Sequence, residues 1–178
     1  MNNNMNNQSH EKCAFCHETT HPLRLCMKAD KQTGFIHGCA VCNEIHPMGN
    51  CPDYLALSPE AQYNLVVLGR GRMPPLDVDE RWTRTVARYD AQASGPLPAP
   101  EFLPWTRDFT IKWISDIDSN NMKRAIIDRF YRFGERAILP VDPLTRTLAV
   151  AWRTASVGFS LRRIGKACAD ASENNNRT

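Results

Sequence analysis

Two uneven distributions along the chain predict its fold class: a small metal-stabilised module, then a mainly α-helical region, with disordered termini. Six of the seven cysteines lie between Cys13 and Cys51, and all five histidines lie between His10 and His46. From about residue 105 onward, apolar residues recur at helical spacing. Both ends of the chain are polar and rich in asparagine, which predicts disorder there.

The cysteines and histidines form two similar units, and twelve residues separate them. The first unit reads C-x2-C-x4-H-x4-C and the second reads C-x2-C-x3-H-x4-C. Two cysteines at this spacing can direct both sulfurs at one point, and the histidine and third cysteine then complete a tetrahedron around zinc. Four protein ligands leave no position for water, so both sites are structural. The predicted ligands of the two Zn²⁺ ions are Cys13, Cys16, His21 and Cys26, and Cys39, Cys42, His46 and Cys51.

Other readings of this segment are weaker. His17 and His37 lie beside the units and compete with the named histidines as ligands. Six reduced core cysteines would fit poorly with a polar segment that has neither strand nor helix periodicity.

The chain has neither a run of apolar residues long enough to span a membrane nor an apolar secretory signal, so an intracellular location is expected. Thiols stay reduced there, which favours metal over disulfides.

The first unit resembles the CCHC zinc knuckle of retroviral nucleocapsid proteins and of cellular single-strand-binding proteins. The resemblance covers about 40 residues, and the second unit is one residue short between Cys42 and His46. The wider layout, with a short helix and the segment GRGRMPPL after the units, resembles uncharacterised fungal proteins with paired knuckles. Knuckles usually carry glycine before the histidine, where this chain has Thr20 and Ile45. The resemblance implies a tandem-knuckle module that binds single-stranded RNA or DNA.

The charge pattern bears on this implied function. Residues 1–53 carry four basic and five acidic side chains, whereas residues 104–178 carry thirteen and eight. Each Zn²⁺ with three thiolates and a neutral histidine adds a charge of −1, so the zinc-loaded module is more acidic still. A nucleic-acid strand would therefore contact the first unit and the linker after it, through the aromatic ring of Phe15 and the cations Arg24, Lys28 and Lys31.

Helix signals follow the units. Ser58 and Pro59 predict a helix start, and a second helix is expected from Val78 to about Ala91. Arg70 and Arg72 flank a glycine and could touch phosphate, or could lie in a solvated turn. Further on, one apolar stripe is expected to include Met122, Ile126, Phe130, Phe133 and Ala137, and a helix is expected to restart at Asp142-Pro143. Arg129, Arg132 and Arg136 would share a helix side that could contact phosphate or be solvated.

These signals predict six segments. A disordered tail (1–12) precedes the tandem CCHC module (13–53) and two short helices with an Arg/Gly/Pro turn (54–91). A Pro-rich linker (92–104), a helical region (105–172) and a second disordered tail (173–178) follow.

No set of catalytic residues can be assigned, so we do not expect an enzyme. The leading hypothesis is a zinc-dependent protein that binds single-stranded nucleic acid. The alternative is a zinc-stabilised protein-interaction or scaffold module whose C-terminal helices recruit a protein partner.

Overall fold

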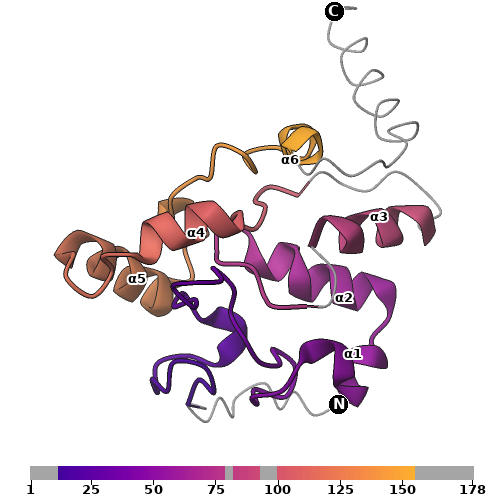
Figure 1. The fold of residues 1–178 in the computed structure, drawn as a ribbon, viewed down its shortest axis with the longest axis horizontal. Coiled ribbons are helices and arrows are strands. Elements are labelled where there is room, and N and C mark those ends of the chain that lie inside the picture. Colours follow the sequence, from indigo (N-terminus) through magenta and orange to yellow (C-terminus); the bar gives the residue numbers. More distant parts are fainter. Residues whose placement is uncertain (1–11, 79–81, 93–99, 155–178) are drawn as a thin grey trace, which may run out of the picture.

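The computed structural model describes residues 12–78, 82–92 and 100–154. Within these ranges the regular elements are helices and there is no strand, which confirms the expected helical class; backbone pairing is limited to two isolated bridges. The α-helices are α1 (Pro52–Leu55), α2 (Pro59–Val66), α3 (Trp82–Gln92), α4 (Arg107–Ile114), α5 (Asn121–Phe133) and α6 (Leu148–Thr154) (Figure 1). Short 3-10 helices are η1 (Leu23–Leu25), η2 (Met48–Asn50), η3 (Leu68–Arg70) and η4 (Arg136–Ile138).

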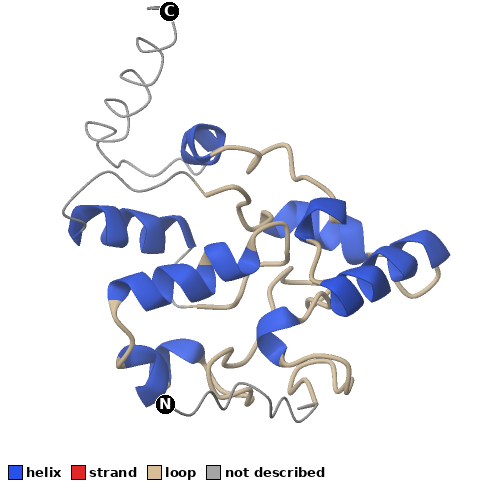
Figure 2. Ribbon diagram, turned by 180° about the vertical axis from the view of Figure 1, so that it is seen from behind, coloured by secondary structure: helices blue, strands red, loops and turns tan. Residues whose placement is uncertain are grey.

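The cysteine-rich segment does not stand apart from the helices. Figure 1 and the reverse view in Figure 2 both show this largely irregular segment lying between α2 on one side and α4 and α5 on the other. The phenol of Tyr131, on α5, accepts a hydrogen bond from Met27 N at 3.0 Å. Lys31 forms an ion pair with Asp118 at 3.0 Å. The C-terminal helices therefore pack on the module, a question that the sequence left open.

Helix α2 begins as predicted. Ser58 is its N-cap, and its hydroxyl accepts a hydrogen bond from Ala61 N at 3.2 Å, while Pro59 occupies the first turn. Helix α3 packs across α2, and the rings of Tyr63 and Tyr89 stack with their centroids 4.7 Å apart. Helix α3 occupies most of the second helix that the sequence predicted from Val78 to about Ala91.

The predicted stripe on α5 is only partly right. Phe130 is buried and Ile126 is partly buried, but the side chains of Met122 and Phe133 are 75% and 61% exposed. Gly134 adopts the left-handed conformation, with φ 69°, and ends the helix. The stripe therefore cannot continue to Ala137, which lies in η4.

The predicted helix restart at Asp142 is wrong. Asp142 is buried, and its Oδ2 accepts hydrogen bonds from the main-chain N and the hydroxyl of Thr106, at 2.6 and 2.7 Å. The carboxylate thus fixes the start of α4 instead of beginning a helix of its own. Helix α6 starts only at Leu148.

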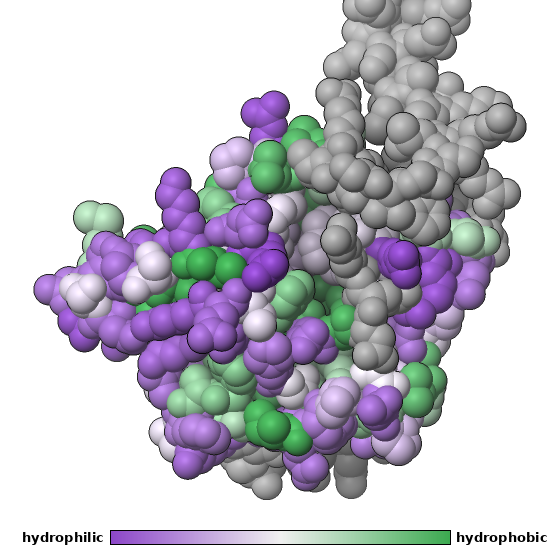
Figure 3. Space-filling model, in the orientation of Figure 1, coloured by the Kyte–Doolittle hydropathy of each residue, from purple (hydrophilic) through white to green (hydrophobic). Residues whose placement is uncertain are grey.

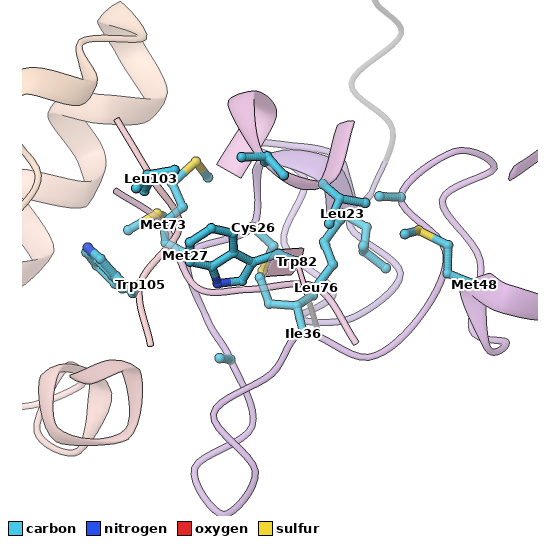
Figure 4. Close-up of a cluster of buried hydrophobic side chains, with 14 of the residues drawn as sticks. Leu23, Cys26, Met27, Ile36, Met48, Met73, Leu76, Trp82, Leu103 and Trp105 are labelled. Atoms are coloured by element: carbon cyan, nitrogen blue, oxygen red, sulfur yellow. The ribbon is translucent and has the colours of Figure 1, made fainter. Parts of the chain in front are cut away.

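One buried cluster runs through the described chain from Cys13 to Ala151. Figure 4 shows its side chains extending from Met48 in the second cysteine unit, past Leu23 in the first, to Met73 and Trp105. The metal-ligand candidates and the helices therefore share one core. Losing the order of the cysteine units would expose apolar surface on both sides of them.

Figure 3 shows the molecule in the orientation of Figure 1. The surface over α5 is mainly polar, and apolar surface shows on the lower part of the same view. In the described ranges, no helix has the length and apolar character needed to cross a membrane.

Candidate metal centres

The structure brings the eight predicted ligands together in two groups. Each group combines three cysteine sulfurs and one histidine nitrogen, and within each group these atoms lie within 4.8 Å of one another. The groups are Cys13, Cys16, His21, Cys26 and Cys39, Cys42, His46, Cys51. Each could hold a metal ion.

The donor spacing fits zinc. Zinc bonds of about 2.0–2.3 Å in a tetrahedron place neighbouring ligand atoms roughly 3.3–3.8 Å apart. Cys16 Sγ lies 3.4 Å from His21 Nε2, within this range, and Cys42 Sγ lies 3.1 Å from His46 Nε2, just below it. Three thiolates with one imidazole are a usual donor set of structural zinc, so the geometry and the chemistry agree. When bound, the ion would cross-link four positions of the chain and leave no open coordination position.

The thiols are too crowded to ionise together without a cation. Hydrogen bonds from Cys16 and Cys26 lower the pKa of Cys13 to about 3, whereas hydrogen bonds with Cys13 and Cys16, together with burial, raise the pKa of Cys26. Burial and the neighbouring Cys39 raise the pKa of Cys42 to about 12. A divalent cation removes this conflict because it stabilises every thiolate at once.

The two units are built on the same local backbone. Residues 13–18 read CAFCHE and residues 39–44 read CAVCNE. Cys13 N donates to Glu18 O at 2.8 Å, and Cys39 N donates to Glu44 O at the same distance. His17 and Asn43, after the second cysteine of each pair, both have left-handed backbones, with φ 63° and 59°. This six-residue repeat is visible in the sequence, and it would have predicted that the two units share one turn conformation.

Each unit closes through a proline and a 3-10 turn. Pro22 precedes η1 and Pro47 precedes η2. Cys26 N then donates to Leu23 O, and Cys51 N donates to Met48 O, at 2.9 and 3.0 Å. The four-residue spacing between histidine and last cysteine is the length of this closing turn.

The first centre is enclosed by the helical region. His21 is 3% exposed, and its ring stacks on that of Tyr131 with centroids 4.2 Å apart and planes 14° apart. The Thr20 hydroxyl lies 2.9 Å from His21 Nδ1, which leaves Nε2 directed at the cysteines. Thr20 is the residue where knuckles usually have glycine, so here the departure orients the ligand.

The second centre is more open. His46 and Cys42 are both partly exposed. His46 Nδ1 lies 3.1 Å from the carbonyl oxygen of Pro47, which it reaches as a donor, so Nε2 is free for a metal. The neighbouring Ile45 is 62% exposed. The first centre therefore lies inside the protein and the second near its surface.

The competing histidines take other roles. His17 is exposed, and it does not belong to either ligand group in the described chain. Both ring nitrogens of His37 are engaged, Nδ1 with Asp77 at 2.7 Å and Nε2 with the Thr33 hydroxyl at 3.0 Å.

Asn43 links the two units. Its Oδ1 accepts hydrogen bonds from Leu23 N at 2.8 Å and from Ala14 N at 3.4 Å, and its Nδ2 donates to Lys12 O at 2.9 Å. The side chain of the second unit therefore satisfies backbone groups of the first. Its left-handed backbone is one that asparagine tolerates better than most residues.

We expect Asn43→Ala to lower the free energy of unfolding by about 2–4 kcal/mol, because it removes these bonds and strains the backbone. Asn43→Gly should cost less, since glycine accepts a positive φ. His17→Gly is the matched control at the equivalent position, and we expect it to be neutral or slightly stabilising. Urea unfolding of zinc-loaded protein measures all three. Equal losses for Asn43→Gly and His17→Gly would show that the Asn43 bonds contribute nothing.

Arg70 is the largest departure from the sequence-based expectation. It is fully buried, so it lies neither in a solvated turn nor where phosphate could reach it. Its guanidinium donates to the carbonyl oxygens of Pro74, Arg24 and Cys26, at 2.5–2.9 Å. Burial lowers its pKa to about 10, and the nearby Cys26 opposes that shift, so the group is charged at neutral pH. The positive charge thus lies against the first metal centre.

The residues predicted to bind nucleic acid are differently placed. Phe15 is partly buried, with its ring 6.2 Å from that of His37. Lys28 pairs with Glu18 at 2.7 Å, and Lys31 is bound to an aspartate of the helical region. Only Arg24 is exposed without a hydrogen-bond or ion-pair partner for its guanidinium among the described residues.

Residues 9–95 match the model of a family described as "Domain of unknown function (DUF8363)". The matched segment contains both cysteine units and α1 to α3, and spans just under half of the chain. Neither the curated proteins nor the solved structures gave a match. The similarity to zinc knuckles therefore remains one of ligand spacing, while the two Cys₃His clusters support metal binding directly.

Proposed function

We propose that this chain is a zinc-stabilised protein-interaction domain. The observation that carries this proposal is that three basic side chains around the first centre, those of Lys28, Lys31 and Arg70, already bind the chain's own carboxylates or carbonyl oxygens. The proposed role needs no catalytic activity.

Two arginines of the helical region are used in the same way. Arg107 donates to the carbonyl oxygens of Thr33 and Gln32, at 2.9 and 3.1 Å. Arg136 donates to the carbonyl oxygens of Leu68 and Gly69. These two arginines thus attach the helical region to the linker between the two cysteine units and to η3.

The arginines expected on one face of α5 do not form a phosphate-binding row. Arg129 pairs with Glu135 at 3.0 Å. Arg136 lies beyond the end of α5, in η4, and therefore does not share a helix side with Arg129 and Arg132. Phosphate contacts dominate the affinity of nucleic-acid-binding proteins, so this arrangement favours a protein partner.

Binding of single-stranded nucleic acid is the competing function. Two assays of zinc-loaded protein distinguish protein interaction from nucleic-acid binding. The first is a gel shift with labelled single-stranded RNA and DNA at about 50 mM salt, where phosphate contacts are strongest. The second is affinity capture of proteins from nuclease-treated extract. We expect no shift, and captured proteins that are lost with the Cys39→Ser variant. A zinc-dependent shift, together with capture that nuclease abolishes, would refute the proposal.

A further inference from the structure

A groove of about 440 Å³ lies between the two metal units and α2. Its apolar lining comes from three separate parts of the chain: Leu25 of the first unit, Val41 of the second, and Leu57 and Leu65 at and beside α2. All four side chains are partly exposed, and Val41, Leu57 and Leu65 pack against the buried core. The groove is therefore formed only when both units and α2 are held together.

The polar lining has one sign of charge. Two arginines, Arg24 and Arg136, line the groove together with Asn64, and no carboxylate of the described residues does so. Arg136 is held by backbone carbonyls, so its charge is not neutralised by an acid in those contacts. Arg24 is exposed, with a free guanidinium among the described residues. An apolar floor beside two cations is complementary to an aliphatic group that carries a neighbouring anion.

We propose that this groove binds a short peptide segment of a protein partner, with an aliphatic side chain on the floor and an aspartate or glutamate beside Arg24. This inference rests on the proposed function and specifies the partner's chemistry. Asn64 is exposed at the groove and has both a donor and an acceptor for the peptide backbone.

The lining also distinguishes a peptide from a nucleobase. Bases bind single-strand proteins by stacking on aromatic rings, and the residues that line this groove include no aromatic side chain. Aliphatic floors instead favour leucine-like or isoleucine-like anchors, as in other peptide grooves.

The test is selection of a random twelve-residue phage-displayed peptide library on zinc-loaded, full-length protein. We expect enriched sequences that combine aliphatic and acidic residues.

Arg24→Glu and Val41→Asp should each weaken binding of the best synthetic peptide by roughly tenfold or more, measured by fluorescence anisotropy. Ile45→Asp, an exposed apolar position on the same unit as Val41, and Arg146→Glu, an exposed arginine elsewhere, are matched controls that should leave affinity unchanged. Each variant must retain the zinc content of the parent protein.

Three outcomes would overturn the groove proposal: no enrichment, enrichment of basic sequences, or enriched peptides whose affinity the two groove variants do not change. Competition for the groove by a single-stranded oligonucleotide would also overturn it. If the groove variants still capture the same proteins from extract, the interaction domain stands and only the groove assignment fails. If the parent protein captures no protein at all, the proposed function fails first.

Discussion

Replacing Cys13 by serine will abolish the cooperative unfolding transition of the whole described chain, not of the first unit alone. Structural zinc contributes on the order of 10–16 kcal/mol of apparent binding free energy in small modules, which matches or exceeds the roughly 5–15 kcal/mol that stabilises an ordinary domain. The first centre is also where α5 and η3 are attached, because Met27 N donates to Tyr131 of α5 and Arg70 of η3 donates to Cys26 O. The measurement is urea unfolding followed by tryptophan fluorescence, with the fully buried Trp105 as a reporter of native packing.

Cys39→Ser should have a milder effect. It damages the second centre, which is nearer the surface, and leaves the Tyr131 and Arg70 contacts in place. We expect a transition that remains cooperative at a lower urea midpoint. Cys168→Ser removes a cysteine outside both clusters and is the control for loss of a thiol. Native tryptophan fluorescence in Cys13→Ser, or equal effects of the two ligand variants, would contradict this account of the first centre.

Arg70→Met will destabilise the protein by about 3 kcal/mol or more. The methionine side chain fills part of the space but leaves the buried carbonyl oxygens of Pro74, Arg24 and Cys26 without donors, and each unsatisfied buried group costs about 1–3 kcal/mol. It also removes the positive charge that lies against the thiolates of the first centre. We therefore expect a lower affinity for zinc as well as lower stability, measured by urea unfolding and by competition with a chelator.

The control for Arg70 is Arg146→Met. Arg146 is exposed, and changes at such positions usually stay within about 0.5 kcal/mol. Arg70→Lys tests geometry separately from charge, since an ammonium group cannot reach three carbonyls in the planar arrangement of a guanidinium. If Arg70→Met and Arg146→Met unfold at the same urea concentration, the buried guanidinium has no structural role.

The features that the sequence predicted well are local ones. The spacing of cysteine and histidine identifies both ligand groups because four ligands around one ion must lie within a short, defined length of chain. The cap at Ser58 was equally clear, since a capping hydroxyl acts on a backbone group only three residues away.

The features that it predicted poorly depend on contacts between distant segments. A buried arginine is rare, so the sequence around Arg70 predicted a solvated or phosphate-binding turn. Two of the three carbonyl oxygens that bind its guanidinium belong to Cys26 and Arg24, which lie 44 and 46 residues earlier in the chain. Asp142 resembles a helix start in sequence but binds Thr106, the N-cap residue of α4, 36 residues away. The enclosure of His21 by Tyr131 spans 110 residues and has no local signature.

The nucleic-acid hypothesis weakened for the same reason. Lysines and arginines in a sequence count as available cations until their partners are known. Lys28 and Lys31 both have carboxylate partners, and the partner of Lys31 lies 87 residues away. Net charge alone therefore overstated the surface that a phosphate backbone could use.

The most direct test of the account is the zinc content of the purified chain, measured by inductively coupled plasma mass spectrometry after removal of loosely bound metal. We expect two zinc ions per chain in the parent protein and the loss of one from the Cys39→Ser variant, with the first centre still loaded. A parent protein that folds cooperatively with no bound metal, or with a single ion shared by both clusters, would contradict it.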